Sequence, residues 1–591
     1  MTTTTKRRTT DEQQRVVEHP RGRHAVVAAV AGSGKTSTMV ERVRWLMSVG
    51  GVKAERILVL MFNKLARDQF KTRIREAGLP DVVRGRVFTF HSFSYGLIQR
   101  EGITIAGQEM WIEDKAEMAR YCGRDAIHNL EQRGAIPRNH IQVKDLLEDI
   151  GHWKANLIPP VLERAGHRLS PYMPLAYVEF ERLRTERRGL TFDDFVVEAV
   201  RILEAPGRAR QSPFDAIIVD EYQDVNLGQQ RMVELLAGDT ADVMVVGDDD
   251  QTIYEWRGAR PQLIRGEFAR RMASKPTDVY ALTRSFRFGP EIAQAADNSI
   301  VLNTRLPKSL IAHDARKAGE VSIHCETGER LGGTSGSLVD EMRHVIRQLQ
   351  DAGVRDLSER IVVLGRTFAQ LSTLEADMLR WRLPYRILGM APFFERREVL
   401  AVLDYARLAL ALDEPVTRAL GARIRSIANV PRRMLSDRLL DQLEKRAEAG
   451  GESVRGLLRF FADDPDSPAG SREQEQLLGF VSLLEQLARR FARPVVEELE
   501  GVRKEWSSMP AGKALEVIVK EAALREYYAK FYGGRLESED RIANVDAIVN
   551  YATESGHTIH DFLPHVDSLD STFGRPVQQQ ILMTPVFRTK G

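Results

Sequence analysis

The sequence predicts an α/β protein with two parallel-sheet domains, each interrupted by a mostly helical insertion. Two observations predict this class. Short apolar runs that end in glycine or polar residues alternate with longer helix-patterned segments, which is typical of parallel strands joined by crossover helices. Two such regions occur, and each gives way to a long, charged, helix-patterned stretch before strand character returns.

The composition is that of a large globular protein. The chain has 591 residues, of which 28% are charged and 43% hydrophobic. Such a chain is long enough for about four domains. Its net charge of +2 gives no overall electrostatic preference for nucleic acid, so any such partner must bind in a local groove.

The sequence predicts neither a membrane partner nor a disulfide framework. No apolar stretch approaches the ~20 residues that span a bilayer, and the start, MTTTTKRRTT, lacks the apolar core of a signal peptide. We therefore expect a cytoplasmic protein. Cys122 and Cys325 lie far apart without metal-ligand spacing, which favours core residues over a disulfide or a zinc site.

The first α/β domain is predicted to be split along the chain. It follows a disordered tail (1–10) and consists of residues 11–95 and 206–284, with the helical stretch 96–205 inserted between them. We expect the two parts to form one domain because Lys35 in the first part and Asp220 in the second are both predicted, from the motifs described below, to act at the same bound phosphate. Its candidate strands are 26–30, 57–61, 86–90, 216–219 and 243–246.

The second α/β domain is predicted at residues 285–391 and 555–591, around a helical insertion at 392–554. Its candidate strands are 321–324, 360–364 and 580–583. Glycine-, serine- and proline-rich loop signals divide the insertion at 449–453 and 463–471.

A phosphate-binding loop follows the first strand. The run AVAGSGKT ends in glycines that let backbone N–H groups approach phosphate oxygens, while Lys35 neutralises the β- and γ-phosphates and the Thr36 hydroxyl ligates Mg²⁺. The alternative is a glycine turn with a solvated lysine. The residues predicted to bind ATP here are Ala31, Gly32, Ser33, Gly34, Lys35, Thr36 and Ser37.

An acidic pair follows the strand 217–219. Carboxyl ends of parallel strands carry ligands in open sheets, so Asp220 is predicted to hold Mg²⁺ through water and Glu221 to polarise the attacking water. A solvated acidic loop is the alternative, but it explains neither the strand nor the pairing. Together the two runs predict ATP hydrolysis with Mg²⁺.

Three strings, AVAGSGKT, VDEYQD and MVVGDDDQTIYEWRGAR, follow one another in an order and spacing that resemble the UvrD/Rep family of superfamily 1 DNA helicases. The resemblance runs across essentially the whole chain. It implies two RecA-like P-loop motor domains, 1A (11–95 and 206–284) and 2A (285–391 and 555–591), with helical insertions 1B (96–205) and 2B (392–554).

The resemblance also assigns nucleotide contacts. Gln13 matches the residue that reads adenine, although Gln14 leaves the register open, and Phe286 and Arg287 match a pair that stacks on the base and reaches the γ-phosphate. Gln251 matches the residue that senses the γ-phosphate, and Arg42 is a further candidate for a nucleotide contact. The implied catalytic residues are Glu221, Gln251 and Arg287.

Single-strand binding needs aromatic faces on which bases stack, with cations nearby. The positions that match DNA contacts in the family are Phe62, His91, Phe192, Tyr254, Trp256, Arg257 and Thr584. For any single aromatic residue the alternative is a place in the core. Trp256, set among charged residues just after Gln251, is the one for which we most expect a DNA contact.

The resemblance implies ATP-driven movement in the 3′ to 5′ direction, with single-stranded DNA and single/double-strand junctions as partners. The last residues, ILMTPVFRTKG, resemble only the start of a family motif, and the next motif, which carries a second arginine for the γ-phosphate, has no counterpart. We therefore expect the second motor domain to be incomplete, as in a truncated or split helicase completed by a second polypeptide.

Two other functions remain open from the sequence. One is a nucleotide-gated DNA-binding or regulatory protein that grips ATP and DNA without unwinding. The other is an ATPase that acts on RNA or on a protein partner.

Overall fold

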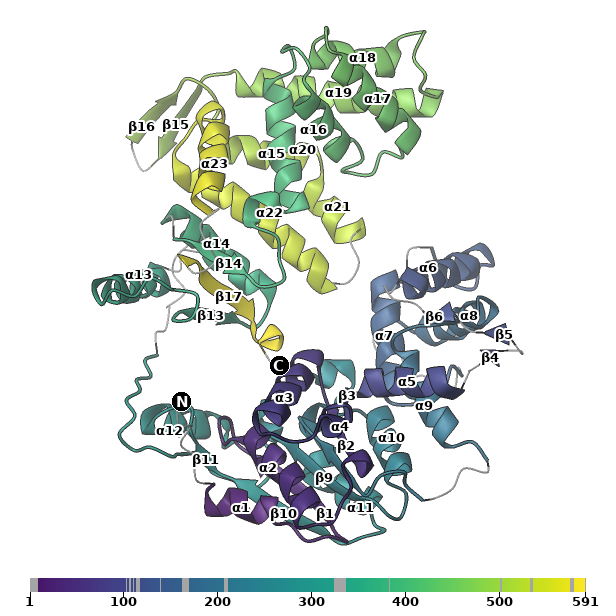
Figure 1. The fold of residues 1–591 in the computed structure, drawn as a ribbon. Helices are drawn as coiled ribbons and strands as arrows, with labels where there is room; N and C mark the ends of the chain where they lie inside the picture. The colour runs from purple at the N-terminus through teal and green to yellow at the C-terminus, as the bar shows by residue number, and fades with distance from the viewer. Residues whose placement is uncertain are drawn as a thin grey trace. The chain divides into compact units, whose positions relative to one another are not determined.

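The structure is a computed structural model, and it describes residues 9–101, 104–105, 108–109, 111–112, 117–138, 140–161, 170–206, 211–323, 336–381, 383–499, 502–531, 535–573 and 579–589. The chain divides into two compact units, one up to Ile323 and the other from His324 to Lys590 (Figure 1). Residues 1–8 of the predicted tail lie outside the described residues, whereas Thr10 caps the first helix.

The first unit is built on a six-stranded sheet of order β10-β1-β9-β8-β2-β3. Every neighbouring pair is parallel. The strands are β1 (His24–Ala29), β2 (Ile57–Met61), β3 (Val87–Thr89), β8 (Ala216–Val219), β9 (Asp242–Gly247) and β10 (Thr277–Leu282). The five strands expected from the sequence are confirmed. The strand β10 was not expected, because it is only partly buried and has no continuous apolar run.

Helices cover both faces of this sheet, which is why its inner strands read as unbroken apolar runs. Along β1, Val26 faces one core while Ala25 and Val27 face the other. The helices packed on the sheet are α1 (Asp11–Val17), α2 (Lys35–Ser48), α3 (Lys64–Glu76), α5 (Phe90–Glu101) and α10 (Leu227–Ala237). Shorter helical pieces are α4 (Asp81–Arg84), α11 (Phe268–Arg271), η1 (Ala54–Arg56), η2 (Tyr222–Asp224), η3 (Asp249–Gln251), η4 (Glu255–Arg257) and η5 (Leu263–Glu267).

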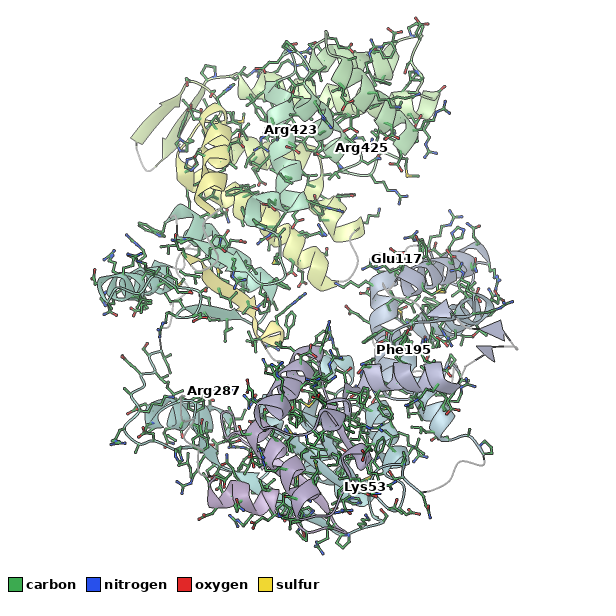
Figure 2. The ribbon with its side chains drawn as sticks, in the orientation of Figure 1. Lys53, Glu117, Phe195, Arg287, Arg423 and Arg425 are labelled. Atoms are coloured by element: carbon green, nitrogen blue, oxygen red, sulfur yellow. The ribbon has the colours of Figure 1, made fainter. Side chains whose placement is uncertain are left out.

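The predicted insertion between β3 and β8 is mostly helical, as expected. Its helices α6 (Glu117–Gln132), α7 (Val143–Ala155) and α8 (Met173–Glu186) enclose a core of their own. A fourth helix, α9 (Asp194–Leu203), leads back to the sheet, where it packs on α5 and α10. Figure 2 labels Glu117 at the start of α6 and Phe195 in α9. Four two-residue strands complete this region, namely β4 (Thr104–Ile105), β5 (Gln108–Glu109), β6 (Trp111–Ile112) and β7 (Gly189–Leu190).

Residues 285–323, predicted to open the second domain, cluster with the first unit in this structure. They contain β11 (Arg284–Ser285), α12 (Pro290–Ile300) and β12 (Ile311–Ala312). The Phe286 N–H donates to the Gly32 carbonyl at 2.9 Å, which attaches this segment to the first sheet. The strand expected at 321–324 is not formed at residues 321–323, and residue 324 lies outside the described residues.

The second unit brings together segments from distant parts of the chain. Its parallel sheet has the order β13-β17-β14, with β13 (Val362–Gly365), β14 (Tyr385–Ile387) and β17 (Ile581–Pro585). The helices α13 (Gly336–Asp351) and α14 (Phe368–Arg380) belong to the same region. This pairing is the one expected from a domain interrupted by a helical insertion.

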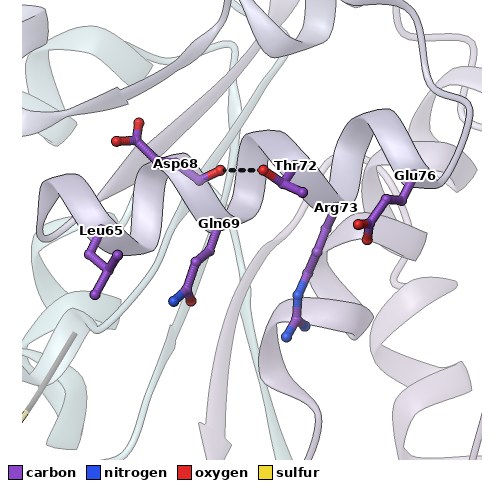
Figure 3. A pocket seen from close by; sticks show the side chains of 6 residues that line it. All are labelled: Leu65, Asp68, Gln69, Thr72, Arg73 and Glu76. Atoms are coloured by element: carbon purple, nitrogen blue, oxygen red, sulfur yellow. Dashed lines mark hydrogen bonds between the residues drawn. The ribbon is translucent and has the colours of Figure 1, made fainter. Parts of the chain in front are cut away.

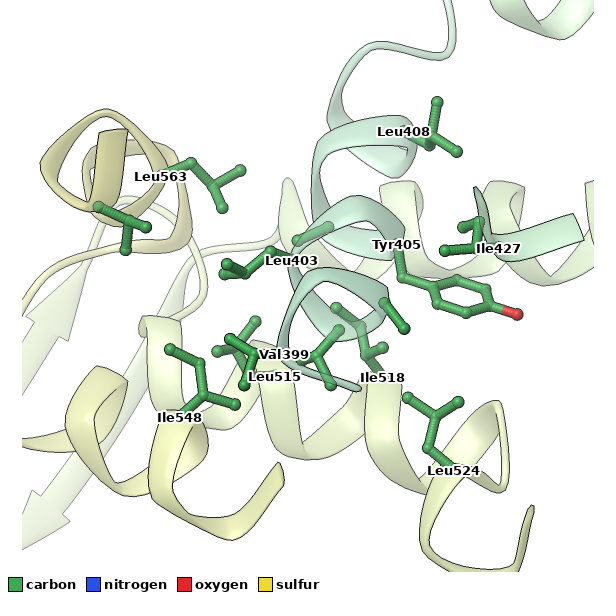
Figure 4. Packing of buried hydrophobic residues seen from close by; sticks show 14 of the residues in the cluster. Val399, Leu403, Tyr405, Leu408, Ile427, Leu515, Ile518, Leu524, Ile548 and Leu563 are labelled. Carbon is green, nitrogen blue, oxygen red and sulfur yellow. The ribbon is translucent and has the colours of Figure 1, made fainter. Parts of the chain in front are cut away.

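That insertion has a continuous apolar core around α15, where Val399, Leu403 and Tyr405 pack among Leu515 and Ile518 (Figure 4). Its helices are α15 (Arg397–Leu410), α16 (Arg418–Ala428), α17 (Asp437–Ala449), α18 (Val454–Asp463), α19 (Ser471–Phe491), α20 (Ala511–Glu521), α21 (Leu524–Phe531), α22 (Arg535–Ser555) and α23 (Ile559–Phe573). An antiparallel hairpin, β15 (Val495–Leu499) and β16 (Val502–Trp506), was not expected. Short 3₁₀ turns are η6 (Phe393–Glu395) and η8 (Val586–Arg588). Among the described residues, no helix combines the length and apolar character that a membrane crossing requires.

Candidate nucleotide and nucleic-acid site

The functional residues predicted in the first unit follow the carboxyl ends of its strands. Because all six strands are parallel, these ends lie at one edge of the sheet. The loop after β1 carries Lys35, the loop after β8 carries Glu221, and the loop after β9 carries Gln251. Phe62 follows β2 and His91 follows β3 at the same edge.

The loop between β1 and α2 has a backbone that requires glycine. Gly32 and Gly34 have φ values of 75° and 79°, in the left-handed region that other residues rarely adopt. A Cβ on Gly32 would lie 2.6 Å from the Cβ of Arg287, and one on Gly34 would lie 2.8 Å from Nε2 of Gln13. Gln13 and Arg287, which are both predicted to bind nucleotide, therefore lie in close contact with this loop.

Gln13, the residue expected to read adenine, is held against this loop. It forms a capping box with Thr10 at the start of α1, and its Nε2 donates to the Ser33 carbonyl at 2.9 Å. Gln14 instead directs its side chain to Glu18 on the exposed side of the helix. The structure thus brings Gln13, not Gln14, to the loop, while the adenine contact stays a prediction.

The loop residues fit a bound Mg²⁺–nucleotide. The Ser33 hydroxyl is 2% exposed and has no hydrogen-bond partner within the described part of the chain, which leaves it available to a phosphate oxygen. Lys35 Nζ lies 3.8 Å from Glu221 Oε2, so the lysine faces the acidic strand end across the loop. Thr36 opens the helix beside Lys35, and the loop is flanked by the half-buried Ala31 and the exposed Ser37.

The acidic strand end is held in an unusual conformation. Glu221 has φ 48° and ψ 43°, a left-handed conformation that costs a non-glycine residue about 1–3 kcal/mol. Its N–H donates to Asp220 Oδ1 at 2.9 Å, which fixes the predicted metal ligand Asp220 relative to the predicted catalytic residue Glu221. Asp220 itself is buried.

Gln223, which the sequence analysis did not single out, connects this pair to the next strand. Its Nε2 donates to Glu221 Oε2 at 2.7 Å, and its Oε1 accepts from the Asp248 N–H at 2.9 Å. Any side chain on Gly247 would overlap this amide. The run VDEYQD contains Gln223, but only the fold reveals that Asp248 is its partner.

Gln251 lies in the turn η3 after β9, and its Nε2 donates to Asp248 Oδ2 at 2.6 Å. Hydrogen bonds therefore run from Glu221 through Gln223 and Asp248 to Gln251. Arg287, labelled in Figure 2, follows β11 with its Cβ against the phosphate loop, and the Phe286 ring lies 4.2 Å from that of His313. The structure thus places Glu221 and Arg287 against this loop and links Gln251 to Glu221 through hydrogen bonds, while the catalytic roles of the three residues stay predictions.

Arg42 is a correction to the predicted nucleotide contacts. Its guanidinium is buried, donates to the Val17 carbonyl at 2.9 Å and to the His19 carbonyl, and stacks 4.6 Å from the Trp45 ring. Burial lowers the pKa of Arg42 to about 10. These contacts give Arg42 a role in fixing the end of α1 against α2, rather than in contacting nucleotide.

One aromatic group extends from the loop after β9. Phe62 and Tyr254 stack with their ring centroids 5.4 Å apart, and Tyr254 lies 6.4 Å from Trp256. Arg257 is placed 4.7 Å from the Trp256 ring. Tyr254 is buried, in keeping with the core alternative, whereas Trp256 is 50% exposed and presents a face to solvent.

A second aromatic pair lies at the end of β3. His91 and Phe192 stack with centroids 4.0 Å apart and planes 12° apart, and Phe192 is 57% exposed. Burial lowers the pKa of His91 to about 4, so the imidazole is neutral at pH 7. A neutral ring stacked on Phe192 forms an apolar platform rather than a cationic one.

The loop that carries Phe192 is fixed by a buried ion cluster that the sequence analysis missed. Asp194 accepts from the Thr191 N–H at 2.8 Å and from its hydroxyl at 2.6 Å, and it pairs with Lys154 at 2.7 Å. Lys154 also pairs with Glu181 at 2.7 Å. These partners come from α7, α8 and α9, so no local sequence pattern reveals them.

Thr584 belongs to the second unit. It lies fully buried in β17, beside Leu364 of β13, and its hydroxyl donates to the Pro585 carbonyl at 3.3 Å. The DNA contact of Thr584 stays a prediction.

One further pocket lies along a face of α3 (Figure 3). Its lining residues recur at helical spacing and are Leu65, Asp68, Gln69, Thr72, Arg73 and Glu76. The Thr72 hydroxyl donates to the Asp68 carbonyl of its own helix. Arg73 reaches Ser37 Oγ at 3.4 Å, so one end of this pocket adjoins the phosphate-binding helix.

Comparison with known proteins agrees with this geometry. Residues 9–269 match the model of the UvrD/REP helicase N-terminal domain. The chain is 28% identical over 566 residues to DNA helicase II of Escherichia coli (strain K12), a match that covers 93% of this chain and 71% of the relative. It is 28% identical over 512 residues to ATP-dependent DNA helicase UvrD1 of Mycobacterium tuberculosis (strain ATCC 25618 / H37Rv), covering 83% of this chain and 63% of the relative. With ATP-dependent DNA helicase Rep of E. coli (strain K12) the identity is 26% over 529 residues, covering 86% of this chain and 74% of the relative.

Proposed function

We propose that this chain, whose residues 9–269 match the UvrD/REP helicase N-terminal domain and which is similar to DNA helicases over most of its length, hydrolyses ATP to move along single-stranded DNA and to unwind duplex DNA. The proposed direction is 3′ to 5′, and the proposed substrates are single strands and single/double-strand junctions. The proposed cofactors are ATP and Mg²⁺.

One observation carries the proposal: a single loop joins the hydrolytic residues to the stacking residues. The loop after β9 begins with Asp248, which is bonded to Gln223 beside Glu221. It continues through Gln251 to Trp256 within one short stretch of chain. A displacement at Gln251 therefore reaches the exposed aromatic face through only a few peptide bonds.

The residues divide the hydrolytic work as follows. When bound, Mg²⁺–ATP supplies the phosphoanhydride bond, with the metal held by Thr36 and Asp220. Lys35 and the loop amides hold the phosphates, while Glu221 orients a water and accepts its proton. Gln223 keeps the Glu221 carboxylate in place by its hydrogen bond of 2.7 Å. Loss of a positioned general base commonly costs about 10²- to 10⁴-fold in rate.

The proposed DNA contacts are made mainly by aromatic residues. The exposed face of Trp256 and the His91–Phe192 pair each offer a surface on which a base can stack. Such stacking is worth about 1–3 kcal/mol per base and depends little on sequence. We therefore propose a grip on single strands without strong base preference, with Arg257 supplying positive charge beside Trp256.

The test is steady-state ATP hydrolysis by the 591-residue chain with and without an oligo-dT strand, beside the Glu221→Gln variant. We expect strong stimulation by DNA, abolished in the variant. Unwinding of duplexes with a single 3′ or a single 5′ tail then tests direction, and we expect only the 3′-tailed duplex to be opened. Binding of ATP and DNA without turnover by the unmodified chain would instead favour the nucleotide-gated DNA-binding protein.

A further inference from the structure

Three consecutive aspartates, Asp248, Asp249 and Asp250, follow β9 with one oxygen of each within 4.8 Å of the others. Such a cluster requires a compensating cation. The structure supplies one from the protein itself: Lys308 Nζ lies 3.2 Å from Asp248 Oδ1 and 3.1 Å from Asp250 Oδ2, and it also pairs with Asp249. The Lys308 side chain is 0% exposed.

Two arginines complete the charge balance. Arg265 pairs with Asp249 at 3.0 Å, and Arg305 pairs with Asp250 at 2.7 Å. Three cations thus surround the three aspartates, and one of them, Arg305, also pairs with Asp297 at 3.1 Å. Burial alone would lower the pKa of Lys308, but the carboxylates outweigh burial and raise this pKa above its ordinary value, so the ammonium stays charged.

Lys308 acts on a carboxylate that is shared with the hydrolytic residues. While Asp248 Oδ1 faces Lys308, Asp248 Oδ2 accepts the hydrogen bond from Gln251 at 2.6 Å. The N–H of the same aspartate donates to Gln223, which holds Glu221. The orientation of Asp248 therefore determines where Gln251 lies.

Lys308 also belongs to the segment that carries Arg287. That segment begins with the Phe286 N–H bonded to the Gly32 carbonyl, runs through α12, and returns to the loop after β9. There the Leu306 N–H donates to Asp249 Oδ2 at 2.8 Å. The segment is thus attached at one end to the phosphate loop and at the other to the loop that carries Gln251.

We infer that Lys308 is a positioning residue for hydrolysis: by orienting Asp248 it fixes Gln251 and joins the Arg287 segment to the loop after β9. This inference rests on the proposed function. Lys308 touches neither nucleotide nor DNA in this role. Its loss should lower turnover without weakening nucleotide binding.

The experiment compares four chains: wild type, Lys308→Met, Gln251→Ala and the double variant. For Lys308→Met we expect DNA-stimulated kcat to fall about 10-fold, with the KM for ATP and the Kd for a non-hydrolysable ATP analogue changed less than about 3-fold. If Lys308 acts through Gln251, the double variant should be no slower than Gln251→Ala alone. Multiplied losses in the double variant, or unchanged kcat in Lys308→Met, would overturn the inference.

Two further variants separate positioning from general instability. Lys275 pairs with Asp242 at 2.7 Å at the opposite end of β9, so Lys275→Met removes a similar ion pair from the same strand. We expect this control to keep wild-type kcat, and an equal loss would contradict a specific role for Lys308. Lys308→Met/Asp250→Asn restores charge neutrality and protects the fold, and its kcat should remain low.

Failure of the proposed function gives a different result. A wild-type chain without DNA-stimulated turnover contradicts the proposed function and, with it, this inference. A wild-type chain that turns over beside an equally active Lys308→Met contradicts only the role of Lys308.

Discussion

Trp256 and Tyr254 come from the same short loop, but the structure gives them different roles. Tyr254 is buried against Phe62, where it supports the loop, while half of the Trp256 side chain is exposed beside Arg257. We therefore expect the loss of Trp256 to weaken DNA binding without destabilising the fold.

For Trp256→Ala we expect the Kd for single-stranded DNA to rise about 5- to 150-fold, because one base loses a stacking partner worth about 1–3 kcal/mol. Nucleotide binding without DNA should stay unchanged. Fluorescence anisotropy with a labelled oligo-dT strand measures the first quantity. Trp381→Ala is a matched control, since Trp381 is also exposed with an arginine, Arg343, 4.1 Å from its ring. Equal weakening by both substitutions would argue against a specific stacking site.

The half-buried, desolvated imidazole of His91 makes the stability of the fold depend on pH. Its folded-state pKa is about 4, below the ordinary value of 6.5, so the unfolded chain takes up this proton first as the pH falls. The resulting loss in the free energy of unfolding is absent above about pH 6.5, grows as the pH falls from 6.5 to 4, and is constant below pH 4. At pH 5 it amounts to about 2 kcal/mol.

We therefore expect His91→Gln to lose less stability than wild type when the pH is lowered from 7 to 5. Urea unfolding at the two pH values measures the difference. The exposed His128 provides the comparison, since His128→Gln should follow the wild-type pH dependence. Parallel behaviour of His91→Gln and wild type would refute the burial argument.

At the scale of elements, α7, α8 and α9 are tied together by buried charges. Lys154 of α7 pairs with Glu181 of α8 and with Asp194 of α9, and Asp194 in turn orders the loop that carries Phe192. The helices thus hold a stacking residue through ionic contacts as well as through their apolar core.

Lys154→Met should lower the free energy of unfolding by about 3–5 kcal/mol, because it leaves the buried Asp194 and the half-buried Glu181 with Arg184 as the one cation still paired to both among the described residues. The same variant should weaken DNA binding, since the Phe192 loop loses its anchor. Thermal and urea unfolding measure the stability loss. Arg201→Met removes the pair between the exposed Arg201 and the half-buried Glu198 on α9 and should cost less than about 1 kcal/mol. A cost for Lys154→Met as small as that of this control would be incompatible with a buried cluster.

The inner strands β1, β2, β8 and β9 were predictable because both of their faces are covered, which makes each an unbroken apolar run. The strand β10 escaped prediction because an edge position leaves it half-exposed and chemically mixed. The residues after the inner strands were predictable for the same reason, as polar groups that end apolar runs. Sequence patterns could not reveal the roles of Gln223, Lys154 and Lys308. The partners of these residues lie far away in the sequence, and only the fold brings them together.

For the molecule as a whole, charge is nearly balanced, because the chain has 85 basic and 83 acidic residues. Many of the cations in the first unit are already paired within the protein, as Lys308 and Lys154 illustrate. The proposed DNA binding would therefore depend on aromatic surfaces and on a few local cations such as Arg257.

We accordingly expect the affinity for single-stranded DNA to depend only moderately on salt. With about 3–6 phosphates neutralised, a plot of log Kobs against log salt concentration should have a slope between about −2 and −4. Titrations of oligo-dT at several salt concentrations give this slope. A value much steeper than that would point to an extended basic surface in place of the aromatic groups.

Both helical insertions leave and re-enter their sheets in the same way. Within the described residues, the first insertion departs after the outermost strand β3 and returns into the interior strand β8, while the second departs after the outermost strand β14 and returns into the central strand β17. A crossover that starts at the rim can grow in length without breaking any ladder of backbone hydrogen bonds. Either helical insertion could therefore lengthen or shorten without interrupting the sheet from which it departs.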